Sequence, residues 1–248
     1  MRPDHPTPAL ETEWPTVPGT GTAKAGPALS WAWRATLSNW ELWVPFAATG
    51  LVVMVLNFRL FLPLTPLVIA ALVIPFSSTT ALRQTRERRF GVWDIRVTAY
   101  REVLLTALLA VAVCTGVFVA VSTLVTVGVD DLFAARTFGQ GAPFYQTSLF
   151  WMLTGIVVLL NLMAPLLNMV LFYSADGRSM WEAVVPGVLT GLRNYRALLG
   201  IAVAATALNA VGLLFLGIGL CLTLPTTLLA FAHAYVQVVG EQVPTGRR

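Results

Sequence analysis

Two apolar stretches decide the fold of this chain: VLLTALLAVAVCTGVFVAVSTLVTV at residues 103–127 and SLFWMLTGIVVLLNLMAPLLNMVLF at residues 148–172. Neither stretch contains an Asp, Glu, Lys or Arg. A hydrocarbon core about 30 Å thick is crossed by about 20 apolar residues of helix, so each stretch predicts one tilted transmembrane span. We therefore expect an integral membrane protein.

The composition points the same way. Of the 248 residues, 56% are hydrophobic and 11% are charged, whereas a soluble domain carries about 25% charged residues. These values exclude a soluble globular domain, a disordered chain and a disulfide-rich secreted scaffold. Cys114 and Cys221 lie within apolar runs, where a thiol packs as a small hydrophobic group. We expect no metal site and no cofactor.

Two further apolar runs are too long for a single crossing. Residues 43–78 would reach about 54 Å as one helix, well beyond the hydrocarbon core of about 30 Å. The polar interruption at residues 57–59 marks a turn and gives spans near residues 42–57 and 61–80.

The last run, residues 197–239, divides at Gly217-Ile218-Gly219 in the same way. The runs together predict an all-α polytopic membrane protein with six transmembrane helices. We expect these helices to form three hairpins within one domain, residues 28–239.

The distribution of positive charge predicts the orientation. With the N-terminus inside, 14 of the 16 Lys and Arg residues fall in inner segments, and such segments face the cytoplasm. Both termini are therefore expected to be cytoplasmic. Residues 1–27 hold six of the fifteen prolines, a composition that predicts a disordered tail. Residues 240–248 form a second, shorter cytoplasmic tail.

Short amphipathic segments are predicted to lie in the membrane interface before each odd-numbered span, because each places tryptophan beside polar residues. They lie at residues 29–34, 92–96 and 180–184. Their similarity suggests a threefold repeat of one interfacial helix and one hairpin; the preference of every inner boundary for Trp and Arg is the alternative explanation.

Two serines have the spacing of a capping box. Ser38 precedes Glu41, and Ser179 precedes Glu182, each by three residues. A serine hydroxyl and a glutamate at this spacing satisfy the free N–H groups of a helix N-terminus. We therefore expect a helix to begin at both places.

The predicted spans contain no Asp, Glu, Lys or Arg. Ion-coupled transporters and proton pumps need ionisable groups at mid-membrane depth, so the sequence disfavours both classes. Asn161, Asn168 and Asn209 either join helices by hydrogen bonds, which the sequence favours, or line a polar cavity. His233 lies near the inner end of the last span and is expected to be an interface residue.

An arginine-rich segment follows the second predicted span. It contains Arg83, Arg86, Arg88 and Arg89. Arginines at the inner surface attract anionic lipid headgroups by about 1 kcal/mol each, and they also hold a loop inside. The sequence favours the topological role and leaves lipid-headgroup binding as the alternative.

The chain contains three groups of short motifs: residues 28–34 with 39–40, residues 176–183 with 191–195, and residues 217–219, 225 and 232–235. In these motifs the chain resembles a known family, the six-span bacterial membrane proteins of the YciC-like type. Those proteins are similar to the membrane domain attached to some glycerophosphodiester phosphodiesterases. The resemblance implies a six-helix bundle of the bacterial plasma membrane without an established activity, and no catalytic domain accompanies it here.

These observations favour a non-enzymatic membrane protein that acts as an accessory or assembly subunit, or that organises lipid through its helix surfaces and its arginine-rich face. The alternative is a transporter or lipid-translocating component whose cavity contains Asn161, Asn168 and Asn209. The expected partners are anionic lipid and a membrane protein subunit, and no nucleic acid. The oligomeric state is left open.

Overall fold

The computed structural model describes residues 16–60, 67, 69–87, 99–133, 148–215 and 217–244, with some side chains inside helices left aside. The described residues are mostly helical, with one short pair of strands. The elements are β1 (Thr16–Pro18), α1 (Ala25–Ser38), α2 (Trp40–Leu60), the π-helix η1 (Ile69–Val73), α4 (Ile74–Arg86), α5 (Tyr100–Phe133), α6 (Ser148–Ala175), α7 (Met180–Arg193), α8 (Tyr195–Leu214), α9 (Leu220–Val239) and β2 (Gln242–Pro244).

Within the described residues, four helices are long and apolar enough to cross a membrane: α5, α6, α8 and α9. They match four of the six predicted spans, and the predicted break at residues 217–219 separates α8 from α9. The chain is therefore a membrane-embedded helical protein. Helix α2 covers the first predicted span, and part of the second lies outside the described residues, so the six-span count stays a prediction.

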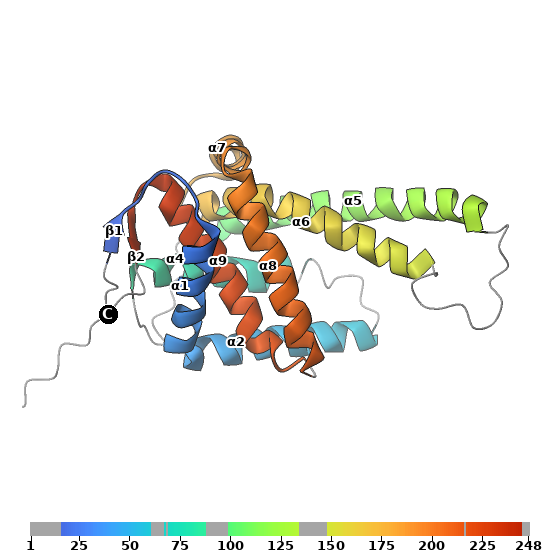
Figure 1. The fold of residues 1–248 in the computed structure, drawn as a ribbon, viewed down its shortest axis with the longest axis horizontal. Helices are drawn as coiled ribbons and strands as arrows, with labels where there is room; N and C mark the ends of the chain where they lie inside the picture. Colours follow the sequence, from blue (N-terminus) through green and yellow to red (C-terminus); the bar gives the residue numbers. More distant parts are fainter. Residues whose placement is uncertain are drawn as a thin grey trace, which may run out of the picture.

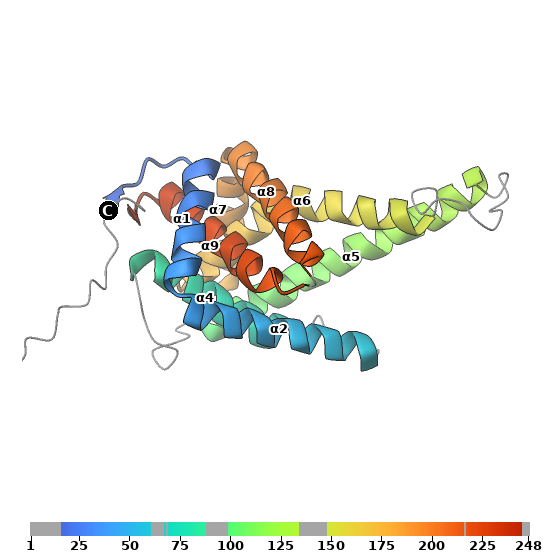
Figure 2. The same cartoon turned by 60° about the horizontal axis from the view of Figure 1, so that its bottom comes forward.

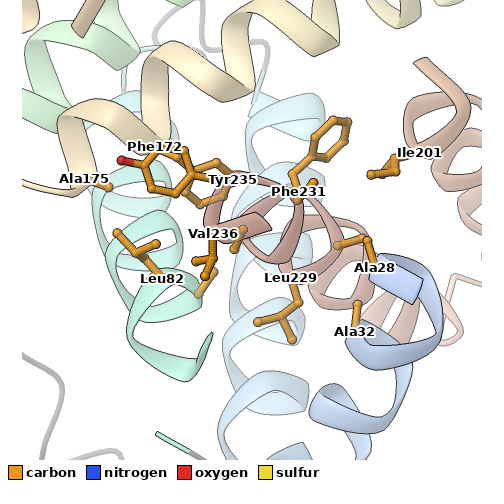
Figure 3. Close-up of a cluster of buried hydrophobic side chains, with 14 of the residues drawn as sticks. Ala28, Ala32, Leu82, Phe172, Ala175, Ile201, Leu229, Phe231, Tyr235 and Val236 are labelled. Atoms are coloured by element: carbon orange, nitrogen blue, oxygen red, sulfur yellow. The ribbon is translucent and has the colours of Figure 1, made fainter. Parts of the chain in front are cut away.

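Helix α9 is the centre of the fold. It packs against α1, α2, α4, α6 and α8. Of the residues in the apolar stretch of α9, 67% are buried inside the protein, whereas the share for α5 is 17%. Figure 3 shows its side chains Leu229, Phe231 and Tyr235 among residues from the surrounding helices, such as Ala28 of α1 and Phe172 of α6. The least apolar of the four candidate spans is thus the one that the protein buries.

Helices α5 and α6 form a long pair that projects beyond the rest of the molecule (Figure 1). Large apolar side chains such as Phe118 and Val158 are exposed on this pair, as expected of helices that face lipid. Helices α8 and α9 run across the pair in both views (Figure 2). The predicted arrangement as three hairpins is not confirmed.

Buried polar side chains join the helices beneath α9. The Nε1–H of Trp43 donates to Oε1 of Gln84 at 2.6 Å, and Nε2 of Gln84 donates to the carbonyl of Ala35 at 3.0 Å. The hydroxyls of Thr36 and Thr226 lie 3.0 Å apart. Because both groups of the Gln84 amide are satisfied, α1, α2 and α4 meet at a fixed register.

Helix α7 crosses α6 at very short range. A Cβ atom added at Gly187 would lie 2.6 Å from Cα of Val170, and one at Gly191 would lie 3.0 Å from the carbonyl oxygen of Pro165. Two glycines four residues apart on one helix face allow this approach, as in close helix pairs of other membrane proteins.

The predicted capping boxes have different outcomes. Ser179 accepts from the N–H of Glu182, whose carboxylate accepts from the N–H of Ser179, and α7 begins there as predicted. The prediction at Ser38 is wrong. Ser38 is the last residue of α1 and its hydroxyl donates to Ala35, while the carbonyl of Asn39 accepts the first bonds of α2. The two helices are nearly continuous, so no free N-terminus is left for Ser38 to cap.

The predicted disordered tail differs from the structure over residues 16–27, where the chain is ordered against residues 242–244. Strand β1 pairs antiparallel with β2, with Val17 opposite Val243, and α1 already begins at Ala25. We call residues 16–24 the N-terminal strap. Residues 1–15 and 245–248 lie outside the described residues.

The segments predicted to lie in the membrane interface also have different outcomes. Trp181 of α7 is 77% exposed, whereas Trp31 of α1 is 2% exposed and stacks on His233 with ring centroids 4.8 Å apart. Trp31 is thus a core residue, because α1 packs along α9 instead of lying on the surface. The segment at residues 92–96 is outside the described residues, so the threefold repeat stays a prediction.

Candidate functional site

Asn161, Asn168 and Asn209, which the sequence singles out, lie on one cavity of about 270 Å³. We call this cavity the asparagine groove. Its walls come from the middle of α6, α8 and α9, which lie side by side in the fold (Figure 1). The lining residues are Leu160, Asn161, Ala164, Asn168, Ala202, Ala205, Thr206, Asn209, Thr227, Leu228 and Phe231.

The spacing of the residues creates the groove. Asn161 and Asn168 are seven residues apart, which places them on the same face of α6 two turns apart. Ala164 lies between them, and Ala202 and Ala205 face them from α8. These small side chains leave space where larger ones would close the helix contact.

The polar groups of the groove are only partly satisfied. Nδ2 of Asn161 donates to the carbonyl of Val157 at 2.8 Å, and its Oδ1 accepts from Thr206 at 3.0 Å. Nδ2 of Asn168 donates to the carbonyl of Ala164 at 2.9 Å. Oδ1 of Asn209 is buried and has no hydrogen-bond partner within the described part of the chain. An acceptor in that state is a ready partner for a donor group of a ligand.

The groove lies halfway along its helices. Asn161 and Asn168 are each about 5 Å along the axis from the midpoint of the apolar segment Thr154–Ala175, at 1.5 Å per residue. Thr206 lies about 2 Å from the midpoint of α8 on the same count. About 10 Å of helix or more therefore separates Asn161, Asn168 and Thr206 from the nearer end of their helical segments.

An apolar cavity adjoins the asparagine groove. It has a volume of about 390 Å³ and lies between α5 and α6, with Val111, Phe118 and Ile156 among its lining residues. Leu160 lines both cavities. A partly polar cavity and an apolar cavity thus share one lining side chain.

The arginine-rich segment has partners inside the chain. Nε of Arg83 lies 2.9 Å from Glu87, and Nη2 of Arg86 lies 2.9 Å from Asp176 and 3.2 Å from Glu241. Burial lowers the pKa of Arg86, but the hydrogen bond to Asp176 and the charges of Glu241 and Asp176 raise it by more. The pKa therefore lies above its ordinary value.

Asp176 also accepts from the hydroxyl of Tyr235 at 3.1 Å, so this cluster joins α4, α9 and the turn after α6. The sequence does not predict the pairs of Arg86 with Asp176 and Glu241 or of Asp176 with Tyr235, because their members are at least 59 residues apart in the chain. Arg88 and Arg89 lie outside the described residues, and the binding of lipid headgroups by the four arginines stays a prediction.

His233 is a core residue, and the prediction that it lies at the interface is wrong. It is 1% exposed, with Nε2 3.0 Å from the carbonyl of Pro244 and Nδ1 3.1 Å from Nε2 of Gln237. A carbonyl accepts only, so we assign the proton to Nε2 of a neutral ring, and Nδ1 accepts from Gln237. The pairing of β1 with β2 covers this end of α9, and that long-range contact is what buries the ring.

Metal ligands are not grouped in the described residues: no three His, Cys, Asp or Glu side chains there are placed to hold one ion. Comparison with known proteins gives no match to a family model, a curated protein or a solved structure. The resemblance to the YciC-like proteins therefore stays a prediction.

Proposed function

We propose that this protein is a lipid-translocating component of the bacterial plasma membrane, in which the asparagine groove receives the polar part of a lipid and the adjoining α5–α6 cavity receives an acyl chain. One observation carries the proposal: the two cavities share Leu160 as a lining residue, and Leu160 lies near the middle of a helix that is long enough to span. A lipid that moves its headgroup between leaflets must pass that depth.

The chemistry of the lining supports an uncharged or zwitterionic polar group. The described lining residues carry amides, hydroxyls and apolar side chains. None of these side chains has a charge that would neutralise a charged headgroup within the hydrocarbon. The unpartnered Oδ1 of Asn209 favours a ligand with a hydroxyl or amine donor. A volume of about 270 Å³ corresponds to about nine water molecules, which suits a small headgroup.

The topology that we propose with this function has six spans and both termini in the cytoplasm. The pairing of β1 with β2 supports it, since two paired strands lie on one side of the membrane and require an even number of crossings between them. Reporter fusions at Gly139 and Thr245 are expected to give outside and inside signals respectively. An inside signal at Gly139 would exclude the six-span topology.

Translocation is tested with purified protein in phosphatidylcholine vesicles that contain a fluorescently labelled phospholipid, by following the bleaching of outer-leaflet label with a membrane-impermeant reductant. Wild-type protein should allow nearly complete bleaching. Label that starts in the inner leaflet bleaches in a slower second phase, after it has crossed to the outer leaflet. The Asn161→Leu and Asn209→Leu variants should each slow this phase about fivefold or more, the effect of one lost hydrogen bond to the headgroup.

The matched control is Thr123→Val. Thr123 is exposed on α5 away from the groove and bonds to the carbonyl of Val119, so its loss also removes a polar group from a span. This variant should translocate like the wild type. Equal rates in all four proteins, or no protein-dependent bleaching at all, would refute the proposed function.

An accessory or assembly role is the second candidate, and α7 is the observation that favours it. Trp181, Val185, Leu189 and Leu192 form an apolar stripe on this helix and are 48–77% exposed. Such a stripe suits the membrane interface or a helix of a partner subunit. If the role is correct, a partner that co-purifies with wild-type protein should be lost from the Leu189→Ser variant and retained by Thr123→Val.

A further inference from the structure

A third cavity, of about 570 Å³, is lined by the N-terminal strap, α1, the end of α9 and the β1–β2 pair. Figure 1 shows where these elements lie. We call this third cavity the strap cavity. It shares no lining residue with the asparagine groove, and its size is typical of small-molecule sites. Its lining residues are Val17, Pro18, Thr20, Lys24, Pro27, Ser30, Trp31, Arg34, His233, Gln237, Val243 and Pro244.

Hydrogen bonds from the strap fix the walls of this cavity. The N–H of Lys24 donates to Oε1 of Gln237 at 2.7 Å, and the N–H of Gly21 donates to the Gln237 carbonyl at 3.1 Å. The N–H of Gly19 donates to Glu241 at 2.9 Å, and a Cβ atom at Gly19 would lie 2.8 Å from Cα of Gly240. The strap is therefore held against α9 by its backbone, so the cavity is a formed part of the fold.

The floor of the strap cavity is polar and uncharged. Gln237 accepts from Lys24, so its Nε2 faces Nδ1 of His233, and the Nε2–H of His233 donates to Pro244. Trp31 stacks on the imidazole. The Gln237 amide and the His233 imidazole thus bond to each other and to the backbone of Lys24 and Pro244, and this pattern requires a neutral imidazole.

The charge of the strap cavity comes from its rim. Lys24 and Arg34 are the charged side chains among its lining residues, and both are cations. With Pro27, Ser30 and Trp31 they follow one face of α1 at intervals of three and four residues, which is helical spacing. The opposite wall is apolar, with prolines and valines of β1 and β2.

We propose that the strap cavity binds a phosphate-bearing ligand, with its phosphate between Lys24 and Arg34 and its less polar part against Val17 and Val243. Two cations on one wall and an apolar strip on the other match a phosphomonoester or the headgroup of an anionic phospholipid, and both present the same phosphate chemistry. This site is independent of the lipid path in the asparagine groove.

The test measures binding of phosphatidylglycerol and of glycerol phosphate to the purified full chain in a nonionic detergent, by native mass spectrometry for the lipid and by calorimetry for the soluble ester. The Lys24→Gln, Arg34→Gln double variant should bind about thirtyfold more weakly, from about 1 kcal/mol per lost cation. The matched control is Arg193→Gln, Arg196→Gln, which removes two exposed cations near the start of α8 and should bind like the wild type.

The two ligands distinguish the sources of the phosphate. Binding of the lipid alone assigns the site to a membrane headgroup, and binding of both, with mutual competition, assigns it to phosphate esters in general. Equal affinity of the two double variants for both ligands would overturn the proposal, as would the absence of binding to the wild type.

A third variant keeps the test valid if the loss of Lys24 disturbs the strap. Ser30→Glu places a carboxylate in the lining, on an exposed helical position, without removing either cation. It should melt like the wild type and bind the phosphate ligand at least tenfold more weakly. Unchanged binding by Ser30→Glu would contradict a phosphate between Lys24 and Arg34.

Discussion

Substitution of Gly187 by alanine should destabilise the protein, although alanine is the better helix former. The added Cβ would lie 2.6 Å from Cα and 2.7 Å from N of Val170. These are backbone atoms of α6 and cannot rotate away as a side chain would. Helix α7 would therefore have to move away from α6 where the two helices cross.

The size of the effect follows from two opposing terms. Carbon atoms pack at about 3.5–4.0 Å, so the helices must separate by about 1 Å, and overpacking of this kind costs about 1–3 kcal/mol. The helix propensity of alanine over glycine returns about 1 kcal/mol. Because two backbone atoms are involved, we expect a net loss of about 1–2 kcal/mol. At about 2–4 °C per kcal/mol, the melting temperature falls by about 2–8 °C.

Gly200→Ala is the matched control. The same Cβ atom at Gly200 would lie 3.7 Å from Cβ of Ala25, an ordinary contact, so this variant should gain about 0.5–1 kcal/mol from propensity alone. Thermal unfolding in detergent, followed by circular dichroism, should shift in opposite directions for the two variants. If Gly187→Ala melts at or above the temperature of Gly200→Ala, the close crossing of α6 and α7 is refuted.

Three further predictions concern single side chains. Ser179→Ala should lower the melting temperature, since the loss of an N-cap costs about 1 kcal/mol. Hydrogen bonds with Ser179 lower the pKa of Glu182 from its ordinary 4.5, so the contribution of Glu182 is complete above that value and is lost as the pH falls through the lowered pKa; the difference in melting temperature between the variant and the wild type should narrow over that fall in pH, but the bond from the Glu182 N–H to the Ser179 hydroxyl keeps it above zero. A quencher confined to lipid should reduce the fluorescence of a single-tryptophan variant that retains exposed Trp181, and should leave one that retains buried Trp31 nearly unchanged; equal quenching would contradict the placement of α7 at the interface. Gln84→Leu leaves the buried indole N–H of Trp43 without its partner, whereas the carbonyl of Ala35 keeps its bonds from Ser38 and Asn39; the substitution should cost about 1–3 kcal/mol, and an unchanged melting curve would contradict the buried contact.

The helices that could be predicted are those that single segments determine. The apolar lengths of residues 103–127 and 148–172 predict α5 and α6, and the glycines at 217 and 219 predict the break before α9. The capping box at Ser179 was likewise predictable, because its bonds lie within four residues. Local chemistry suffices in each of these cases.

Other features depend on contacts between distant segments. The same capping spacing at Ser38 fails because α1 continues to that residue, and Trp31 is buried because α1 lies along α9. The asparagine groove could be predicted in part. The sequence indicates which side chains are unusual in a span, but only the packing of α6, α8 and α9 brings them to one cavity.

The N-terminal strap also sets an order of events during biosynthesis. Lys24 bonds to a residue 213 positions later in the chain, so at about 5–20 residues per second the strap waits about 10–40 s for its binding surface to leave the ribosome. During that interval the face of α1 that carries Ala28 and Trp31 has no α9 to cover it. A ribosome that stalls within α9 would therefore release a chain with an exposed α1, which a membrane protease or insertion chaperone could recognise as incomplete.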